Sequence, residues 1–284
     1  MKLNLTLRVL GKRHDGYHEI NSLFWRLRSP ESLEACFGSA RESLSVLGDD
    51  IPGENIIIRA IRHIRDVCGG DAFPPADLRL YKRIPTGSGL GAGSGNAAAL
   101  IDLFRRIYGG TKDAALDLVS IGADVAFLAG SREAALVSGR GEVFEDLNGS
   151  PRAVVVLFFP HWRSDTRRAY EMLDEVRARG SVGAVSESEA RDEAISVFSF
   201  LKDGRRIGLL PNDFLCCVGH EREYSEISAL ADESGALAWG LCGSGSASFV
   251  LFDPNDDVGL RAMLGAIKNG KDGFHWLRKI LVLE

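Results

Sequence analysis

The segment PTGSGLGAGSGNAAA, residues 85–99, decides the fold of this chain, because five of the nine residues from 87 to 95 are glycine. The residues before it, 78–84, alternate between apolar and polar side chains like a half-buried strand, and residues 97–108 are apolar at helical spacing. Glycine lets backbone N–H groups turn inward, and a helix start adds unpaired donors and the positive end of a dipole. The segment therefore predicts a strand, loop and helix that bind phosphate.

Two common nucleotide-binding motifs do not describe this loop. Walker A ends in Gly-Lys-Ser/Thr, and no lysine occurs between Lys82 and Lys112. The dinucleotide fingerprint is matched only loosely, by Gly93, Gly95 and Ala98, and the acidic strand end that it requires about 20 residues later is not evident. A flexible loop without function is the alternative for an isolated Gly-x-Gly, but five glycines before a helix favour phosphate binding.

The composition is that of a globular protein of about two domains, with 284 residues, 45% hydrophobic and 26% charged. A net charge of −5 gives no basic field for nucleic acid. Five cysteines without a CxxC pair predict free thiols, and the scattered histidines predict no zinc site. The apolar run at the amino terminus is interrupted by Arg8 and is too short for a signal peptide or a membrane span. We expect a cytoplasmic protein that binds neither nucleic acid nor membrane.

The amino-terminal residues predict a β-hairpin. Residues 2–9 alternate between polar and apolar side chains, so Lys2 and Asn4 lie on the same face of a strand. The chain then turns at two glycines, and residues 17–27 predict a second strand with His18 near its entrance. A solvated charge is the ordinary role of a lysine such as Lys2, and a role in binding is the alternative.

A carboxylate in an apolar setting, Asp124, stands in the segment GADVAF at residues 122–127. Its ordinary role is to cap the following helical turn, which does not exclude catalysis. An amphipathic helix is predicted over residues 55–68, and a hairpin over residues 136–143.

The pattern restarts near residue 150 with the buried strand AVVVLFF and a helix over residues 166–177. We therefore expect two domains, residues 1–150 and residues 151–284. Residues 178–194, rich in Ser, Glu, Gly and Arg, predict a mobile connection between helices.

A second glycine cluster at residues 240–246 precedes a predicted strand, 247–252, rather than a helix. It is therefore not a phosphate loop of the usual strand-to-helix kind. A tight connection from a helix into that strand is its ordinary interpretation.

Several segments taken together resemble the GHMP small-molecule kinases. The glycine-rich segment marks that family, and DGYHE at residues 15–19 with the amino-terminal Lys-x-Asn is more specific for members that act on a cytidine diphosphate-linked polyol. The chain departs from the family pattern at Gly95, where a second serine is usual, and at Ala126, where a proline is common. The matching segments are KLNLTLRVLGKRHDGYHEINSLF (2–24), KRIPTGSGLGAGSGNAAA (82–99), GADVAFLAGSREAALVSGRGE (122–142), LPNDF (210–214) and GLCGSGSAS (240–248).

This resemblance implies a two-domain α+β GHMP kinase fold, with an amino-terminal ATP-binding domain like ribosomal protein S5 and a ferredoxin-like carboxy-terminal domain. The implied activity is transfer of phosphate from ATP, with Mg²⁺, to a hydroxyl of the cytidine diphosphate-linked polyol in non-mevalonate isoprenoid precursor biosynthesis. The chain would act as a monomer or homodimer. Two alternatives stay open: a GHMP kinase for mevalonate, homoserine or a sugar, and an inactive nucleotide-binding regulator.

The same resemblance implies roles for individual residues. Asp124 would accept the proton of the substrate 4-hydroxyl, while Lys2 would keep that carboxylate charged and stabilise the transferred charge. No ligand of Mg²⁺ is assigned. The implied nucleotide-binding residues are Lys82, Pro85, Gly87, Gly89, Leu90, Gly91, Ala92, Gly93, Ser94, Gly95 and Asn96. The implied substrate-binding residues are Asn4, Tyr17, which would stack on the cytosine, His18, which would bond its edge by side chain or backbone, Asp124, Thr166, Gly243 and Ser244.

Overall fold

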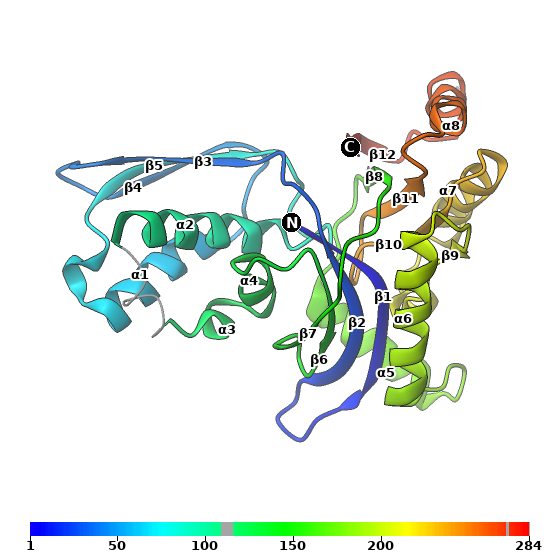
Figure 1. The fold of residues 1–284 in the computed structure, drawn as a ribbon, viewed down its shortest axis with the longest axis horizontal. Helices are drawn as coiled ribbons and strands as arrows, with labels where there is room; N and C mark the ends of the chain where they lie inside the picture. Colours follow the sequence, from blue (N-terminus) through cyan, green and yellow to red (C-terminus); the bar gives the residue numbers. More distant parts are fainter. Residues whose placement is uncertain (109–115, 271–272, 284) are drawn as a thin grey trace. The chain divides into compact units, whose positions relative to one another are not determined.

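The computed structural model describes residues 1–108, 116–270 and 273–283 (Figure 1). The chain divides into two compact units that interleave along the sequence. The first unit comprises Met1–Lys2, Arg26–Thr86 and Gly91–Arg132, and the second comprises Leu3–Trp25, Gly87–Leu90 and Glu133–Glu284. The second unit continues through residue 150, and a boundary between domains at that point stays a prediction.

The first unit is built on a three-stranded sheet. Strand β5 (Ala76–Lys82) lies in its centre, antiparallel to β3 (Ser32–Phe37) and parallel to β4 (Ser43–Gly48). Leu78 and Leu80 of β5 are fully buried, as the alternation in the sequence predicts. This strand leads into the glycine-rich segment.

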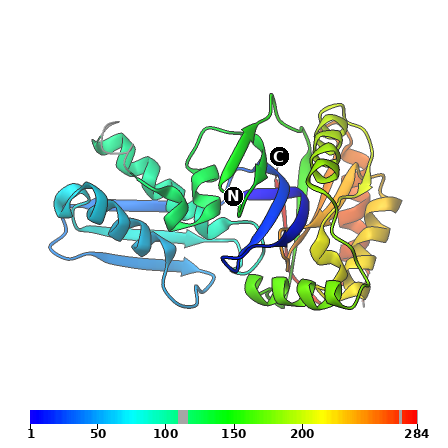
Figure 2. The ribbon, with the colours of Figure 1, turned by 90° about the horizontal axis from the view of Figure 1, so that it is seen from below.

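Two helices cover one face of this sheet (Figures 1 and 2). Helix α1 (Ile56–Cys68) has nearly the predicted bounds, because the Asn55 side chain accepts a hydrogen bond from the Ile57 N–H at 3.0 Å and caps its start. The apolar face of α1 is buried. Helix α2 (Ala92–Tyr108) packs against α1 and follows the glycine loop.

Two short helices complete the described part of the first unit. Helix α3 (Leu118–Ile121) is capped by Asp117, and α4 (Ala123–Leu128) follows directly after Gly122. Gly122 occupies the N-cap position of α4, and Asp124 is the second residue of that helix. The interpretation of Asp124 as the N-cap of this helix is therefore wrong.

The second unit contains a four-stranded sheet in the order β1-β2-β6-β7. Strands β1 (Lys2–Lys12) and β2 (His18–Arg26) form the expected amino-terminal hairpin. Strands β6 (Ala134–Ser138) and β7 (Val143–Asp146) are antiparallel and form the predicted second hairpin. The polar residues of β1 near its start are buried along with the leucines that alternate with them, so both faces of this strand are covered.

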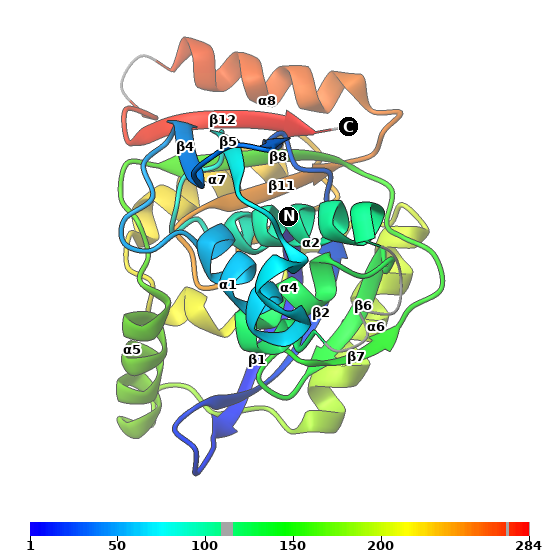
Figure 3. The same cartoon turned by 90° about the vertical axis from the view of Figure 1, so that its left-hand side faces the viewer.

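A five-stranded sheet in the order β12-β8-β11-β10-β9 forms the other layer of the second unit. Helices α7 (Glu221–Glu233) and α8 (Asp257–Asn269) pack on it through a core that includes Phe158, Ile227, Val250 and Met263. Figure 3 shows α8 running along the edge strand β12. The strands are β8 (Val154–Pro160), β9 (Gly208–Leu209), β10 (Ala238–Leu241), β11 (Ser248–Phe252) and β12 (Leu277–Leu283).

Helix α5 (Thr166–Ala178) has the predicted bounds and packs on β1 and β2, with Leu173 against Val9 and Ile20 in one apolar cluster. The connection predicted for residues 178–194 is shorter than expected, because α5 extends to Ala178 and helix α6 (Glu187–Lys202) begins inside the predicted range; its mobility stays a prediction.

The second glycine cluster is also not the helix-to-strand connection that was expected. Gly240 lies in β10, and residues 242–247 form the turn of an antiparallel hairpin between β10 and β11.

Candidate active site

Lys2 and Asp124 form a largely buried ion pair in the first unit. The Lys2 Nζ atom lies 3.6 Å from Asp124 Oδ2, and the two side chains are 7% and 27% exposed. The interpretation of Lys2 as a solvated surface charge is therefore wrong. The attraction holds the carboxylate in place while one part of it stays accessible. This is the arrangement that acceptance of a proton from an alcohol requires.

Gly91 lies directly against this ion pair. A Cβ atom at this position would be 2.8 Å from Asp124 Oδ2 and 3.3 Å from Lys2 Cε, and the residue has a φ of +60°. Helix α2 begins at the next residue. The first N–H groups of a helix have no partner within it, and they lie at the positive end of its dipole. A phosphate group attracted to this helix end would lie close to the ion pair.

The second half of the glycine-rich segment is helical. Helix α2 begins at Ala92, five residues earlier than predicted, so residues 93–96 belong to its first turns rather than to a loop. The Gly95 N–H donates to the Gly91 carbonyl at 2.9 Å, so it is used within the helix and is not a phosphate donor. Within residues 85–99, a positive φ occurs at Gly87, Gly89 and Gly91.

Two polar side chains of α2 lie near its start. Ser94 Oγ lies 3.9 Å from the place where a Cβ of Gly122 would stand, close to the start of α4. Asn96 is buried, and its Nδ2 has no hydrogen-bond partner among the described residues. An unpaired buried donor is costly, so this amide suits a ligand that accepts hydrogen bonds.

The Cβ position of Gly95, where the chain departs from the family pattern, faces the interior of the first unit. A Cβ there would lie 3.9 Å from Leu128 Cδ1 and at ordinary contact distance from the main chain of Met1. A second serine hydroxyl would therefore lie against these groups.

Lys82 is part of a buried structural ion pair. Its ammonium lies 2.5 Å from Glu31 Oε1, and the two side chains are 3% and 1% exposed. The same oxygen accepts from the N–H groups of Arg83 and Ile84. Glu31 thus fixes the chain just before the buried Pro85 and the glycine loop, and a direct contact between Lys82 and a nucleotide stays a prediction.

In the second unit, the glycine loop and the second glycine cluster lie backbone to backbone. A Cβ on Gly89 would stand 1.7 Å from the Cys242 carbonyl oxygen, and one on Gly243 would stand 2.9 Å from the Gly89 oxygen. The Ser246 N–H donates to the Gly87 carbonyl at 3.1 Å. The second cluster therefore buttresses the loop, in which Leu90 is also buried.

The expected substrate residues of the second cluster join α5 to this hairpin turn. The hydroxyls of Thr166 and Ser244 are 3.2 Å apart, and Ser164 donates to the Ser244 carbonyl at 2.8 Å. Asn212, from the segment LPNDF, holds the other side of the turn, since its Nδ2 donates to the Gly243 carbonyl at 2.8 Å.

Asn4 lies buried in β1 with its amide oriented by neighbours. Its Nδ2 donates to Ser22 Oγ at 2.9 Å, and Ser22 in turn donates to the Thr6 carbonyl. The other end of the amide, Oδ1, lies 3.4 Å from the place where a Cβ of Gly243 would stand.

Tyr17 presents an exposed ring. Its side chain is the most exposed aromatic group at the hairpin entrance, with 58% of the residue accessible. The Arg140 guanidinium lies 4.9 Å from its ring centroid, a cation–π distance that braces the ring. An aromatic ring held in this way suits stacking on a nucleobase.

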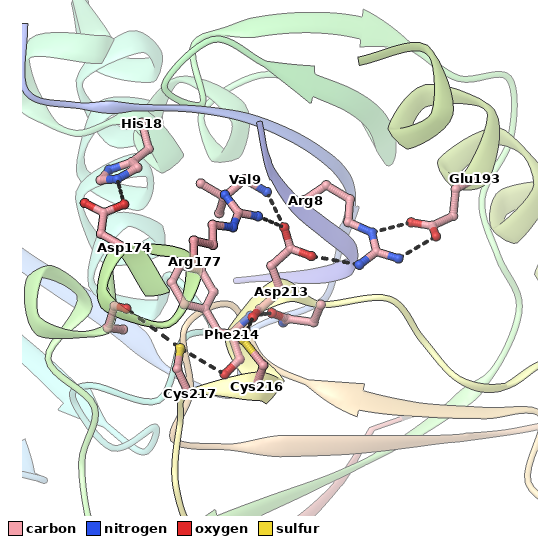
Figure 4. Close-up of polar contacts among 12 residues, drawn as sticks. Arg8, Val9, His18, Asp174, Arg177, Glu193, Asp213, Phe214, Cys216 and Cys217 are labelled. Carbon is pink, nitrogen blue, oxygen red and sulfur yellow. Dashed lines mark hydrogen bonds and ion pairs between the residues drawn. The ribbon is translucent and has the colours of Figure 1, made fainter. Parts of the chain in front are cut away.

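His18, by contrast, is largely buried, and its ring faces the Asp174 carboxylate (Figure 4). Its side chain is 8% exposed, its ring stacks on Tyr170 with centroids 4.5 Å apart, and its Nε2 lies 2.9 Å from Asp174 Oδ1. Asp174 also accepts from Lys12 Nζ at 3.0 Å. Although partial burial alone raises the pKa of Asp174, the hydrogen bonds from His18 and Lys12 outweigh it and hold that pKa below its ordinary value.

Comparisons with known proteins identify the family. The model of the GHMP kinase N-terminal domain matches residues 55–136. A 4-diphosphocytidyl-2-C-methyl-D-erythritol kinase from Solibacter usitatus is 33% identical over 259 residues, which cover 88% of this chain and 79% of the relative. A protein of the same name from Porphyromonas gingivalis is also 33% identical, with 88% and 89% covered. This chain belongs to the 4-diphosphocytidyl-2-C-methyl-D-erythritol kinase family.

The fold agrees with that assignment. A crystal structure of 4-(cytidine 5'-diphospho)-2C-methyl-D-erythritol kinase matches with a TM-score of 0.73 and 26% identity, over 99% of this chain and 96% of that chain. The expected α+β GHMP kinase fold is therefore confirmed. As a member of this kinase family, the chain is a phosphotransferase with an alcohol group as acceptor.

Two further observations concern metal and membrane. Among the described residues, no three His, Cys, Asp or Glu side chains are grouped to hold a metal ion. In the same part of the chain, no helix combines the length and the apolar character needed to cross a bilayer.

The sequence did not indicate Glu31, Arg140, Tyr170 or Asp174. Tyr170 and Asp174 are one helical turn apart on α5, and that i, i+4 spacing is the signal that places both on one face. Nothing in the sequence shows that this face meets His18, because more than 150 residues separate them.

Proposed function

We propose that this chain phosphorylates a free hydroxyl of 4-diphosphocytidyl-2-C-methyl-D-erythritol with ATP, in the non-mevalonate supply of isoprenoid precursors in the cytoplasm. Two curated relatives that carry this name support the substrate. The observation that carries the chemistry is the Lys2–Asp124 ion pair beside Gly91 at the start of α2. Position 4 of the polyol already bears the diphosphocytidyl group, so the acceptor is another hydroxyl.

Asp124 accepts the proton of that hydroxyl as the hydroxyl oxygen bonds to the γ-phosphorus of ATP, while the bond from this phosphorus to the β-phosphate oxygen breaks and ADP leaves. Transfer of a phosphoryl group depends mainly on positioning and on neutralising the negative charge spread over the phosphate oxygens. The ammonium of Lys2 stabilises this charge and keeps the carboxylate oriented. Both groups are largely buried, where such interactions are stronger than in water.

The residues at the start of α2 fit the phosphates of ATP. Gly91 has no side chain that would displace the Asp124 carboxylate, the first N–H groups of the helix are donors, and the buried Asn96 amide offers another. Mg²⁺ that accompanies ATP is usually held by phosphate oxygens, water and one or two protein oxygens, so it needs no large cluster of protein ligands. When bound, Mg²⁺ neutralises charge on the β- and γ-phosphates. Ser94, Gly87 and Gly89 are assigned to the same phosphates, and Lys82 is assigned to the flank of the nucleotide.

Recognition of the cytidine is assigned to the hairpin entrance. The exposed Tyr17 ring stacks on the cytosine, and His18 bonds its edge. Asn4, Thr166, Gly243 and Ser244 contact the remaining part of the substrate, in keeping with their polar groups in the second unit. A kinase for mevalonate, homoserine or a sugar would have no use for an aromatic platform at Tyr17.

The test is release of ADP from ATP and Mg²⁺ with purified protein and four alcohols: 4-diphosphocytidyl-2-C-methyl-D-erythritol, mevalonate, homoserine and galactose. We expect release with the cytidine-linked alcohol alone. Release with another alcohol in preference would contradict the substrate assignment. No release with any of them, under conditions in which ATP binds, would favour an inactive nucleotide-binding regulator.

A further inference from the structure

The hydrogen bonds around His18 determine which ring nitrogen carries the proton (Figure 4). Asp174 Oδ1 lies 2.9 Å from Nε2, and the other carboxylate oxygen accepts from Lys12. An ionised carboxylate has acceptors only, so Nε2 must carry a hydrogen to bond it. In the neutral imidazole, Nδ1 is then an acceptor.

The orientation of the ring is fixed as well. Tyr170 stacks on the imidazole with an angle of 20° between the planes, and the side chain of His18 is 8% exposed. A 180° rotation of the imidazole about its Cβ–Cγ bond would move Nε2 away from Asp174 and break this hydrogen bond. Among the described residues, the hydrogen bond of this ring is the one from Nε2 to Asp174. Nδ1 is therefore available to a ligand.

An acceptor at this position distinguishes two pyrimidines. Cytosine carries an amino group at position 4, which donates hydrogen bonds, whereas the corresponding group of a uracil-type base is a carbonyl oxygen, which accepts them. Nδ1 therefore accepts a hydrogen bond from the amino group of cytosine, whereas it repels the carbonyl oxygen of uracil. Because a buried donor–acceptor mismatch leaves both groups unpaired, it costs more than the absence of a bond.

We propose that Asp174 is a positioning residue that makes His18 Nδ1 a fixed acceptor, and that this selects cytosine over uracil at the base end of the substrate. The inference rests on the proposed function and deepens it, since it assigns the edge contact to the His18 side chain. Asp174 itself touches no substrate; it acts through His18.

The kinetic test compares kcat/KM for the cytidine-linked substrate and for its uridine-linked counterpart. An asparagine at 174 can either accept from Nε2 or donate to it, so both tautomers of His18 become accessible. We expect Asp174→Asn to lower the cytidine-to-uridine ratio by about tenfold, the scale of one hydrogen bond gained or lost. The KM for ATP should stay unchanged, and Asp174→Glu should recover part of the ratio because glutamate only accepts.

Glu175→Gln is the matched control, because Glu175 is the next residue of α5 and its ion pairs with Arg168 and Arg179 are largely exposed. This variant should keep the wild-type ratio. An equal fall in kcat/KM for both substrates in Asp174→Asn would mean a merely structural role and would overturn the inference. An unchanged ratio would overturn it too.

A second measurement does not depend on catalysis. The ¹⁵N chemical shifts of the His18 ring nitrogens, assigned by comparison with His18→Gln, report the tautomer in the free protein. We expect hydrogen on Nε2 in the wild type and a mixture in Asp174→Asn. Hydrogen on Nδ1 in the wild type would refute the inference. The expected shifts would support the positioning role even if the wild type phosphorylated neither substrate, a result that contradicts only the proposed function.

Discussion

At the scale of single residues, the Lys2–Asp124 pair is the group to which we assign the chemistry, and its removal should affect catalysis far more than the fold. We expect Asp124→Asn to lower kcat by about 10²–10⁴, the usual contribution of a positioned proton acceptor. The amide keeps the shape of the side chain, but the buried ammonium of Lys2 loses its charged partner, so the unfolding midpoint should fall while the protein stays folded under the assay conditions. Asp102→Asn is the control, because Asp102 lies on the exposed face of α2, paired with Arg105. Near-normal kcat in Asp124→Asn would show that this carboxylate does not accept the proton.

The residues of the candidate site differ in how well the sequence predicts their contacts. Asp124 and Lys2 stand in segments that resemble the family, so their roles could be predicted before the structure. The partners of His18 could not, because Asp174 and Tyr170 reach it from a helix far along the chain. Lys82 illustrates the opposite case, since its position before the loop suggested a ligand and the structure pairs it with the buried Glu31. Proximity in sequence does not show which partner neutralises a charge.

At the scale of elements, the glycine-rich segment contains two kinds of glycine that look alike in the sequence. Gly91 has a positive φ and no room for a side chain, whereas Gly95 lies inside α2 with ordinary contact distances around its Cβ position. We expect Gly91→Ala to lower kcat/KM strongly, because the methyl group would displace the Asp124 carboxylate. Gly95→Ala should retain activity and raise stability by up to about 1 kcal/mol, the difference in helix propensity.

Measurement of kcat/KM and of urea unfolding for the two alanine variants would check this contrast. Equal loss of activity in both would show that the whole segment, and not its positive-φ half, contacts the substrates.

Element boundaries were the less predictable part of the fold, and local signals explain why. The start of α6 was missed within a Ser- and Glu-rich stretch, although Ser186 and Glu189 form a capping box that marks it. The start of α2 was missed because glycines disfavour helices, and packing of this helix against α1 and α4 outweighs that preference. The β10–β11 hairpin was missed because β10 has only four residues, Ala238–Leu241, and runs directly into the glycine cluster, which hid the strand before the turn.

At the scale of the whole molecule, a buried charge network ties several elements of the second unit together. Asp213 accepts from Arg8 of β1, from the Val9 N–H and from Arg177 of α5, at 2.7, 2.9 and 2.7 Å (Figure 4). Arg8 also makes a two-bond contact with Glu193 of α6. The hydrogen bonds from Arg8 to Glu193 and Asp213, partly opposed by burial, raise the pKa of Arg8.

Removal of the central acid should therefore destabilise the protein far more than removal of a surface charge. Asp213→Asn leaves two guanidinium groups facing a neutral amide, and loss of one partner from a buried ion pair costs about 3–5 kcal/mol. Glu145→Gln removes the partner of Arg191 in a pair whose side chains are 52% and 43% exposed, and it should cost less than about 1 kcal/mol. Urea unfolding of both variants gives the free energies of unfolding directly. Similar losses in the two would mean that Asp213 is solvated in solution, and that β1 and α5 are joined by the apolar cluster of Leu173 and Val9 rather than by charge.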